Sequence, residues 1–188
     1  MTTGSRAQSG TRYGLKIGMT ISDVSEEIEQ VYGKTVKRYG ISLGGYAMIP
    51  LLGPVYLQPE LILSQKGANS DQGVDDGLKL SYIDIPVLIG IGVSDRYSIR
   101  PGAYVGPAIS LLTSSEAEFG ETTVDIGENI TKFDFSVVLG GRTDIRYGDG
   151  AFTFEGRYVI GFESIDDRRG EPTDIRNRSV SFLIGYLF

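Results

Sequence analysis

Charged residues recur inside segments that are otherwise apolar, and their spacing is what could support chemistry in this chain. Most of them stand between apolar neighbours, so in an extended strand they point to the opposite face. Four bases and five acids share this pattern: Lys16, Glu60, Asp84, Arg100, Asp134, Arg142, Asp144, Glu155 and Arg157. Gathered on one face, they could form ion pairs, line a narrow path for ions or solutes, or supply paired catalytic carboxylates, such as Glu155 with Asp134 or Asp144.

Composition narrows this chemistry. The 188 residues include 26 Gly, 11 Tyr and 8 Phe but no Trp, Cys or His. Without His a Ser-His-Asp mechanism is excluded, and without Cys so are disulfides, thiol catalysis and Cys-ligated metals. Asp71, Asp75 and Asp76 are oxygen donors suited to calcium, but their spacing is not that of an EF-hand. We therefore predict no enzymatic activity, no cofactor and no metal site.

The elements that must position these charges are β-strands with one apolar face. Over 179–188 the apolar face carries Val180, Phe182, Ile184, Tyr186 and Phe188, and the other face is mainly small or polar. Period-2 alternation of this kind predicts a β-strand, and its polarity is typical of a strand with lipid outside and a barrel lumen inside. The segments 133–145 and 151–162 repeat it. A soluble lipocalin-type barrel, with the apolar face inward, is the alternative.

Eight candidate strands follow, at about 13–20, 40–49, 54–65, 79–92, 97–112, 132–146, 151–163 and 178–188. The connections near 21–39, 66–78, 113–131 and 164–177 are long, and those near 50–53, 93–96 and 147–150 are short. No apolar run reaches the length of a transmembrane helix. We predict an all-β fold: one eight-stranded antiparallel up-and-down transmembrane β-barrel over 13–188, after a flexible segment 1–12, with both termini on the short-turn, periplasmic side.

Two local features complicate this prediction. Pro59, Pro86, Pro101 and Pro107 fall inside proposed strands, where each removes a ladder hydrogen bond, and we expect bulges to absorb them. Residues 1–11 are polar and lack the apolar segment of a signal peptide. We expect that the signal of an exported precursor has been replaced here, with a cytosolic origin as the alternative.

Five segments resemble the PorT-like, or porin-family, outer-membrane β-barrel proteins of Gram-negative bacteria. They are YGLKIG (13–18), LQPELILSQKG (57–67), LSYIDIPVL (80–88), GAYVGP (102–107) and FDFSVVLGG (133–141). The resemblance implies a location in the bacterial outer membrane, contact with its lipid, and prolines at corresponding strand positions. It also implies that Phe182, Tyr186 and the terminal Phe188 form the aromatic C-terminal signal read by barrel-assembly machinery.

In an eight-stranded barrel the interior is only wide enough for side chains, so the nine charges are predicted to pair as a plug rather than to line a path. The long connections hold 17 of the 24 acidic residues, which disfavours nucleic acid. We expect a monomer that acts through these acidic connections on an extracellular or envelope protein, or in envelope integrity. A small-conductance porin is the alternative. Ile21, Val24, Ile28 and Val31 have helical spacing and predict a short helix in the first connection.

Overall fold

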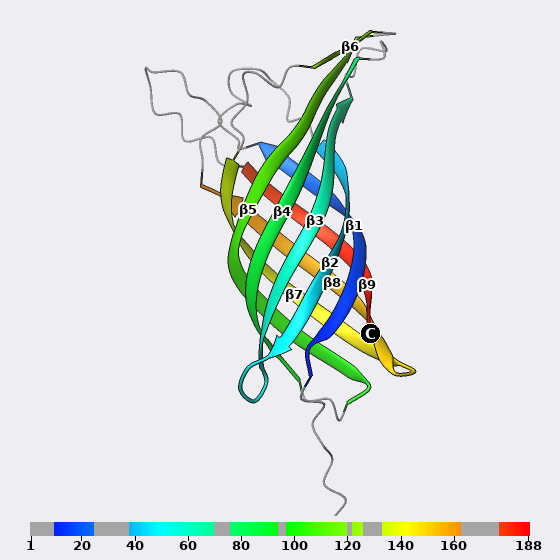
Figure 1. Ribbon diagram of the computed structural model, residues 1–188, viewed down its shortest axis with the longest axis vertical. Helices are drawn as coiled ribbons and strands as arrows, with labels where there is room; N and C mark the ends of the chain where they lie inside the picture. Colours follow the sequence, from blue (N-terminus) through cyan, green and yellow to red (C-terminus); the bar gives the residue numbers. More distant parts are fainter. Residues whose placement is uncertain are drawn as a thin grey trace, which may run out of the picture.

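Strands account for almost all of the described chain. The computed structural model describes residues 10–24, 38–69, 76–93, 97–119, 122–125, 133–162 and 177–188. The strands are β1 (Arg12–Val24), β2 (Arg38–Pro50), β3 (Val55–Asn69), β4 (Asp76–Gly92), β5 (Ile99–Phe119), β6 (Thr122–Asp125), β7 (Phe133–Tyr147), β8 (Gly150–Gly161) and β9 (Asn177–Leu187) (Figure 1). In these parts of the chain there is no α-helix that could serve as a transmembrane segment.

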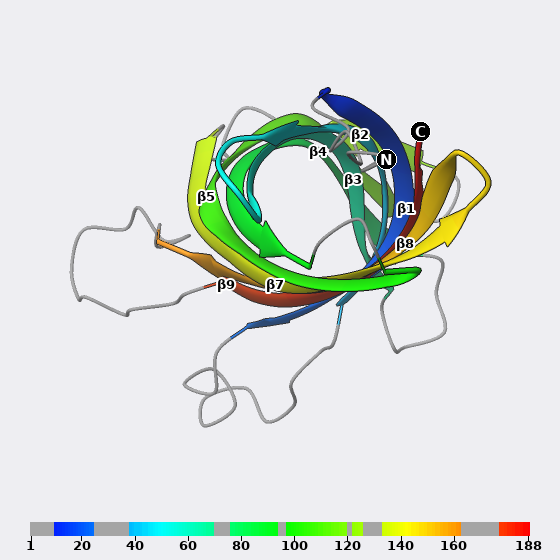
Figure 2. The same cartoon turned by 90° about the horizontal axis from the view of Figure 1, so that it is seen from below.

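Eight of the strands close into a ring. Each pairs antiparallel with its neighbours in the order β1-β2-β3-β4-β5-β7-β8-β9, and β9 returns to β1 (Figure 2). Cross-strand neighbours followed around the ring from Gly14 on β1 return to β1 at Val24, ten residues further on. This stagger is what tilts the strands of a closed barrel. The predicted eight-stranded antiparallel barrel is confirmed.

The alternation of the sequence becomes an inside and an outside. Lys16 is 2% exposed, whereas its neighbour Ile17 is 49% exposed, and the same contrast runs along every long strand. Apolar side chains therefore cover the outer wall, and the lumen contains the charged and polar residues together with tyrosines and some aliphatic side chains such as Leu88 and Leu187. The alternative of a soluble lipocalin-type barrel is wrong, because that fold needs the apolar face inside.

The strands run further toward the long connections than their alternation predicts. β5 continues to Phe119, and the short β6 pairs with its end, outside the ring. Ile21 and Val24 belong to β1, so the predicted helix cannot include them, and Ile28 and Val31 lie outside the described residues. Five of the 17 acidic residues assigned to connections lie instead in strands. The alternation of apolar residues does not reveal these extensions, because a strand segment outside the lipid needs no apolar face and its sequence can be polar.

The prolines are absorbed without bulges, contrary to expectation. Among the described strand pairs, the register shifts only between Ser81 and Tyr82 of β4, away from every proline. Around Pro59 the β2–β3 ladder omits two pairs and resumes in the same register. A missing ladder bond is therefore tolerated in place, since the neighbouring pairs hold the strand.

Short connections and the described chain ends lie together at one end of the barrel. Between β7 and β8 the loop is only Gly148 and Asp149, and Gly148 has φ +60° while Asp149 is not in the left-handed region. Glycine at the first loop position with positive φ is typical of a type II′ hairpin turn. At the same end, the Phe188 amide donates to the Tyr13 carbonyl oxygen at 2.8 Å and closes β9 against β1.

Candidate functional site in the lumen

Four charges from three strands form a closed cluster at the centre of the lumen. Lys16 Nζ lies 2.9 Å from Glu60 Oε1 and 3.0 Å from Glu155 Oε2. Arg157 reaches the same two carboxylates, at 2.9 Å to Glu60 Oε2 and 2.6 Å to Glu155 Oε2. Each carboxylate thus contacts both cations, and all four side chains are at most 4% exposed. The cluster is balanced in charge, as burial in a low dielectric requires.

A second ion pair extends this cluster toward the short turns. Arg142 Nη2 lies 2.7 Å from Asp144 Oδ1, and its Nε donates to the same oxygen at 3.0 Å. Gln58 joins the two groups, since its amide nitrogen donates to Glu60 and its amide oxygen accepts from Arg142. Arg100 is buried and faces Asp144 across the β5–β7 ladder. One continuous hydrogen-bonded network thus joins Lys16, Glu60, Glu155, Arg157, Gln58, Arg142 and Asp144.

Three tyrosine rings complete the packing around these cations. Tyr46, Tyr56 and Tyr104 each lie over a glycine directly opposite on the next strand, where a Cβ atom would collide with the ring. The free faces of the rings meet cations: Lys16 Nζ is 4.3 Å from the Tyr46 centroid, and Arg157 Cζ is 5.5 Å from that of Tyr104. Such contacts strengthen when water is excluded.

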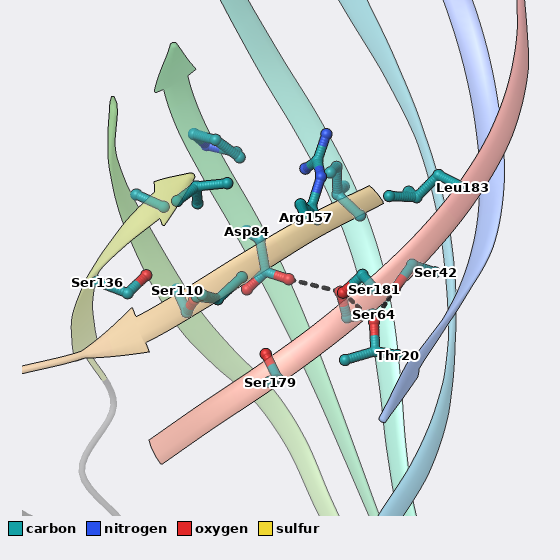
Figure 3. Close-up of a pocket in the computed structure, with 15 residues that line it drawn as sticks. Thr20, Ser42, Ser64, Asp84, Ser110, Ser136, Arg157, Ser179, Ser181 and Leu183 are labelled. Carbon is teal, nitrogen blue, oxygen red and sulfur yellow. Dashed lines mark hydrogen bonds between the residues drawn. The ribbon is translucent and has the colours of Figure 1, made fainter. Parts of the chain in front are cut away.

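Above this cluster, toward the long connections, the lumen changes to small polar side chains. A cavity of about 60 Å³ is lined there by Thr20, Ser42, Ser64, Asp84, Ser110, Ser136, Ser179 and Ser181, with apolar side chains and Arg157 beside them (Figure 3). Asp134 faces Ser110 across the β5–β7 ladder and is half-buried at the same level.

The nine predicted lumen residues therefore separate into two groups. The structure brings Lys16, Glu60, Arg142, Asp144, Glu155 and Arg157 into ion pairs, with Arg100 beside them. Asp84 and Asp134 lie higher, away from these pairs. The predicted network did not include the linking Gln58, the three tyrosines and the ring of serines, although all have the same strand phase as the charges. That shared phase was the available signal, but uncharged side chains do not stand out on it.

The predicted C-terminal aromatic residues lie on the outer wall. Phe182 and Phe188 are exposed there, and Tyr186 packs against Phe152 and Phe188 with ring centroids 5.2 and 5.1 Å away. Tyr147 continues the row at 5.3 Å from Phe152. Aromatic rows of this kind suit the boundary between the hydrocarbon core and the headgroups. As to metals, the described residues contain no group of three or more potential ligands arranged around one ion.

A closed barrel with an apolar wall and a charged interior defines the class of transmembrane β-barrels. The family model for the outer membrane protein beta-barrel domain matches residues 6–167. The chain belongs to this family and is a protein of the bacterial outer membrane. The resemblance to outer-membrane β-barrel proteins is confirmed, and the narrower PorT-like assignment stays a prediction.

Solved structures share the fold at low identity. Neisserial surface protein A has a TM-score of 0.58 and 9% identity, covering 95% of this chain and 99% of its own. Ail of Yersinia pestis, in complex with the heparin analogue sucrose octasulfate, has a TM-score of 0.51 and 12% identity, covering 95% and 99%. At these identities the similarity establishes the fold alone. No curated protein matches the chain in sequence.

Proposed function

We propose that this protein is a non-enzymatic, non-conducting outer-membrane barrel that acts through its long acidic connections, in contact with another envelope or extracellular protein or in envelope integrity. The observation that carries the proposal is the central cluster of Lys16, Glu60, Glu155 and Arg157, which is buried and occupies the middle of the lumen with paired charges. A lumen occupied in this way leaves the surface beyond the strands as the place for function.

The same contacts disfavour catalysis by paired carboxylates. Glu155 is bound to two cations and accepts from the Tyr104 hydroxyl at 3.1 Å, and Asp144 is bound to Arg142. A carboxylate held between cations has neither the proton of a general acid nor access to a substrate. A Ser-His-Asp mechanism needs a histidine, and this chain has none.

Charge indicates the kind of partner. The ranges 25–37, 70–75, 120–121, 126–132 and 162–176 between strands contain twelve acidic and six basic residues. A basic or mixed protein surface complements them, and a polyanion does not. The sulfated ligand seen with Ail is therefore not proposed for this chain.

Planar-bilayer recording tests the closed lumen. We expect no conductance steps from the wild-type protein, and openings in Glu155→Ala, which removes one wall of the cluster. Asp149→Asn, in the exposed turn after β7, is the matched control and should stay silent. Reproducible, ion-selective steps from the wild type that change in Glu155→Ala or Arg142→Ala would establish a small-conductance porin instead.

Membrane topology is tested by introducing single cysteines and labelling them. Because the chain has no cysteine of its own, any labelling comes from the introduced residue. We propose that the termini and short turns are periplasmic and the long connections face outward. A bulky polyethylene glycol maleimide should label Asp167→Cys on intact cells. It should label Asp149→Cys only after the outer membrane is permeabilised. The reverse pattern would invert the proposed orientation.

A further inference from the structure

The upper cavity of the lumen contains a directed chain of hydroxyl groups. Ser64 Oγ donates to Asp84 Oδ2, and Ser42 Oγ donates to Ser64 at 3.4 Å. Because a hydroxyl has one proton to donate, Thr20 must donate to Ser42 at 3.4 Å, and Ser181 to Thr20 at 2.8 Å. The chain of hydroxyls joins five adjacent strands, β9, β1, β2, β3 and β4 (Figure 3), and each hydroxyl in it donates toward the carboxylate.

The carboxylate at the end of this chain is only half satisfied. Asp84 Oδ1 is buried and has no hydrogen-bond partner, and Asp84 forms no ion pair with any described residue. A buried polar atom without a partner in a folded protein calls for a water or an ion. The other oxygen, held by Ser64, fixes the carboxylate in place beside Ser110, its neighbour across the β4–β5 ladder.

The charge around the cavity leaves Asp84 uncompensated. Arg157 reaches the cavity floor, but its terminal nitrogens are bound to Glu60 and Glu155 within the balanced cluster. The remaining lining is neutral, so Asp84 gives the lining a net charge of −1, with hydroxyl oxygens around it; Asp134, which faces Ser110 at the same level, is not part of the lining and has an interaction of its own. Asp84 is half-buried, so water screens its charge less than at the open surface, and an uncompensated carboxylate in that position attracts a counter-ion.

We propose that this cavity binds one small monovalent cation, either an alkali ion or a small protonated amine. Asp84 is the charged ligand, and the hydroxyls of Ser64, Ser110 and their neighbours are neutral ones. A single carboxylate balances one positive charge, whereas divalent ions take several carboxylates. A volume of about 60 Å³ holds about four to six waters, which is room for an ion with part of its hydration shell. The site does not depend on whether the lumen conducts.

Thallium-205 NMR of the protein refolded in detergent micelles tests the site, with Tl⁺ as the probe. We expect the wild-type protein to shift and broaden the Tl⁺ resonance, and added K⁺ or methylammonium to reverse this change. If K⁺ displaces Tl⁺ more strongly, the ligand is an alkali ion; if methylammonium does, it is a small protonated amine. Asp84→Asn should weaken Tl⁺ binding at least tenfold. Asp149→Asn, which removes an exposed carboxylate in the same way, should leave it unchanged.

The proposal would be overturned by equal Tl⁺ binding by wild type and Asp84→Asn, or by an equal loss in Asp149→Asn. An effect that follows chloride at constant cation would also overturn it and assign the cavity to an anion near Arg157. Should Asp84→Asn fail to fold, judged by heat-modifiable gel mobility, Ser110→Ala keeps the charge and removes one neutral ligand. Tl⁺ binding should then weaken several-fold, and unchanged binding would count against the site.

Discussion

Removing the Glu155 carboxylate is the sharpest test of the central cluster. Glu155 accepts from Lys16 and Arg157 and from the Tyr104 hydroxyl, so Glu155→Gln leaves two buried cations facing the single carboxylate of Glu60. Breaking a buried ion pair by removing one partner destabilises a protein by about 3–5 kcal/mol. The equilibrium constant for unfolding should therefore rise by about two to three and a half orders of magnitude.

The assay is urea-induced unfolding in phosphatidylcholine vesicles, followed by circular dichroism and gel mobility. The second variant is Lys16→Met/Glu155→Gln, which restores charge balance and leaves Arg157 with Glu60. It should recover a large part of the lost stability, so that the double-mutant cycle is non-additive. Asp149→Asn should change stability by less than about 0.5 kcal/mol. A loss below about 1 kcal/mol in Glu155→Gln, the size seen for exposed pairs, would refute the cluster as a buried structural unit.

Three further outcomes follow from the wall and the lumen. Gly140→Ala places a methyl group where a tyrosine ring lies and should destabilise the barrel by about 1–3 kcal/mol in the same assay. Gly141→Ala, on the outer face, adds a Cβ atom whose nearest neighbour is the Gly102 carbonyl oxygen at an ordinary 3.7 Å, and should be near neutral. Phe154→Arg puts a charge on the apolar outer wall and should lower the free energy of unfolding in vesicles by about 2–4 kcal/mol. Tyr147→Arg, beside the turn, should lower it by only about 0–1 kcal/mol. Equal losses in the two variants would contradict the membrane depth assigned to these residues. Phe188→Ala should slow assembly in cells, read as the folded fraction in the outer membrane, while unassisted refolding into micelles keeps its rate.

Alternation predicted the ring and its polarity because every long strand separates lipid from lumen. Residues such as Lys16 and Glu155 could be placed on the inner face from their neighbours alone. Their pairing could not, because Lys16 and Glu155 are 139 residues apart and meet only through the register of the closed ring. The extension of β5 to Phe119 was not predicted because this part of the strand does not face lipid. Its sequence therefore lacks the alternating apolar residues by which the other strands were recognised.

Glycine and serine were the least visible parts of the lumen. Nothing in the local sequence indicates that Gly140 lies beneath the Tyr104 ring, because this contact depends on the pairing of β5 with β7. The hydroxyl chain from Ser181 to Asp84 likewise joins β9, β1, β2, β3 and β4. Small side chains acquire a role only when the stagger of the barrel sets them at one height.

The pairing within the charged cluster also constrains the order in which the barrel can assemble. Lys16 lies on β1, the first strand made, and its partner Glu155 lies on β8, next to the last strand. Until β1 meets β9, the sheet is open, so Lys16 can pair with Glu60 on β3 but cannot reach Glu155. The two halves of the cluster, Lys16 with Glu60 and Glu155 with Arg157, therefore meet only when the ring closes. Because polar groups within hydrocarbon must be satisfied inside the protein, ring closure is the step that allows the cluster to exclude water.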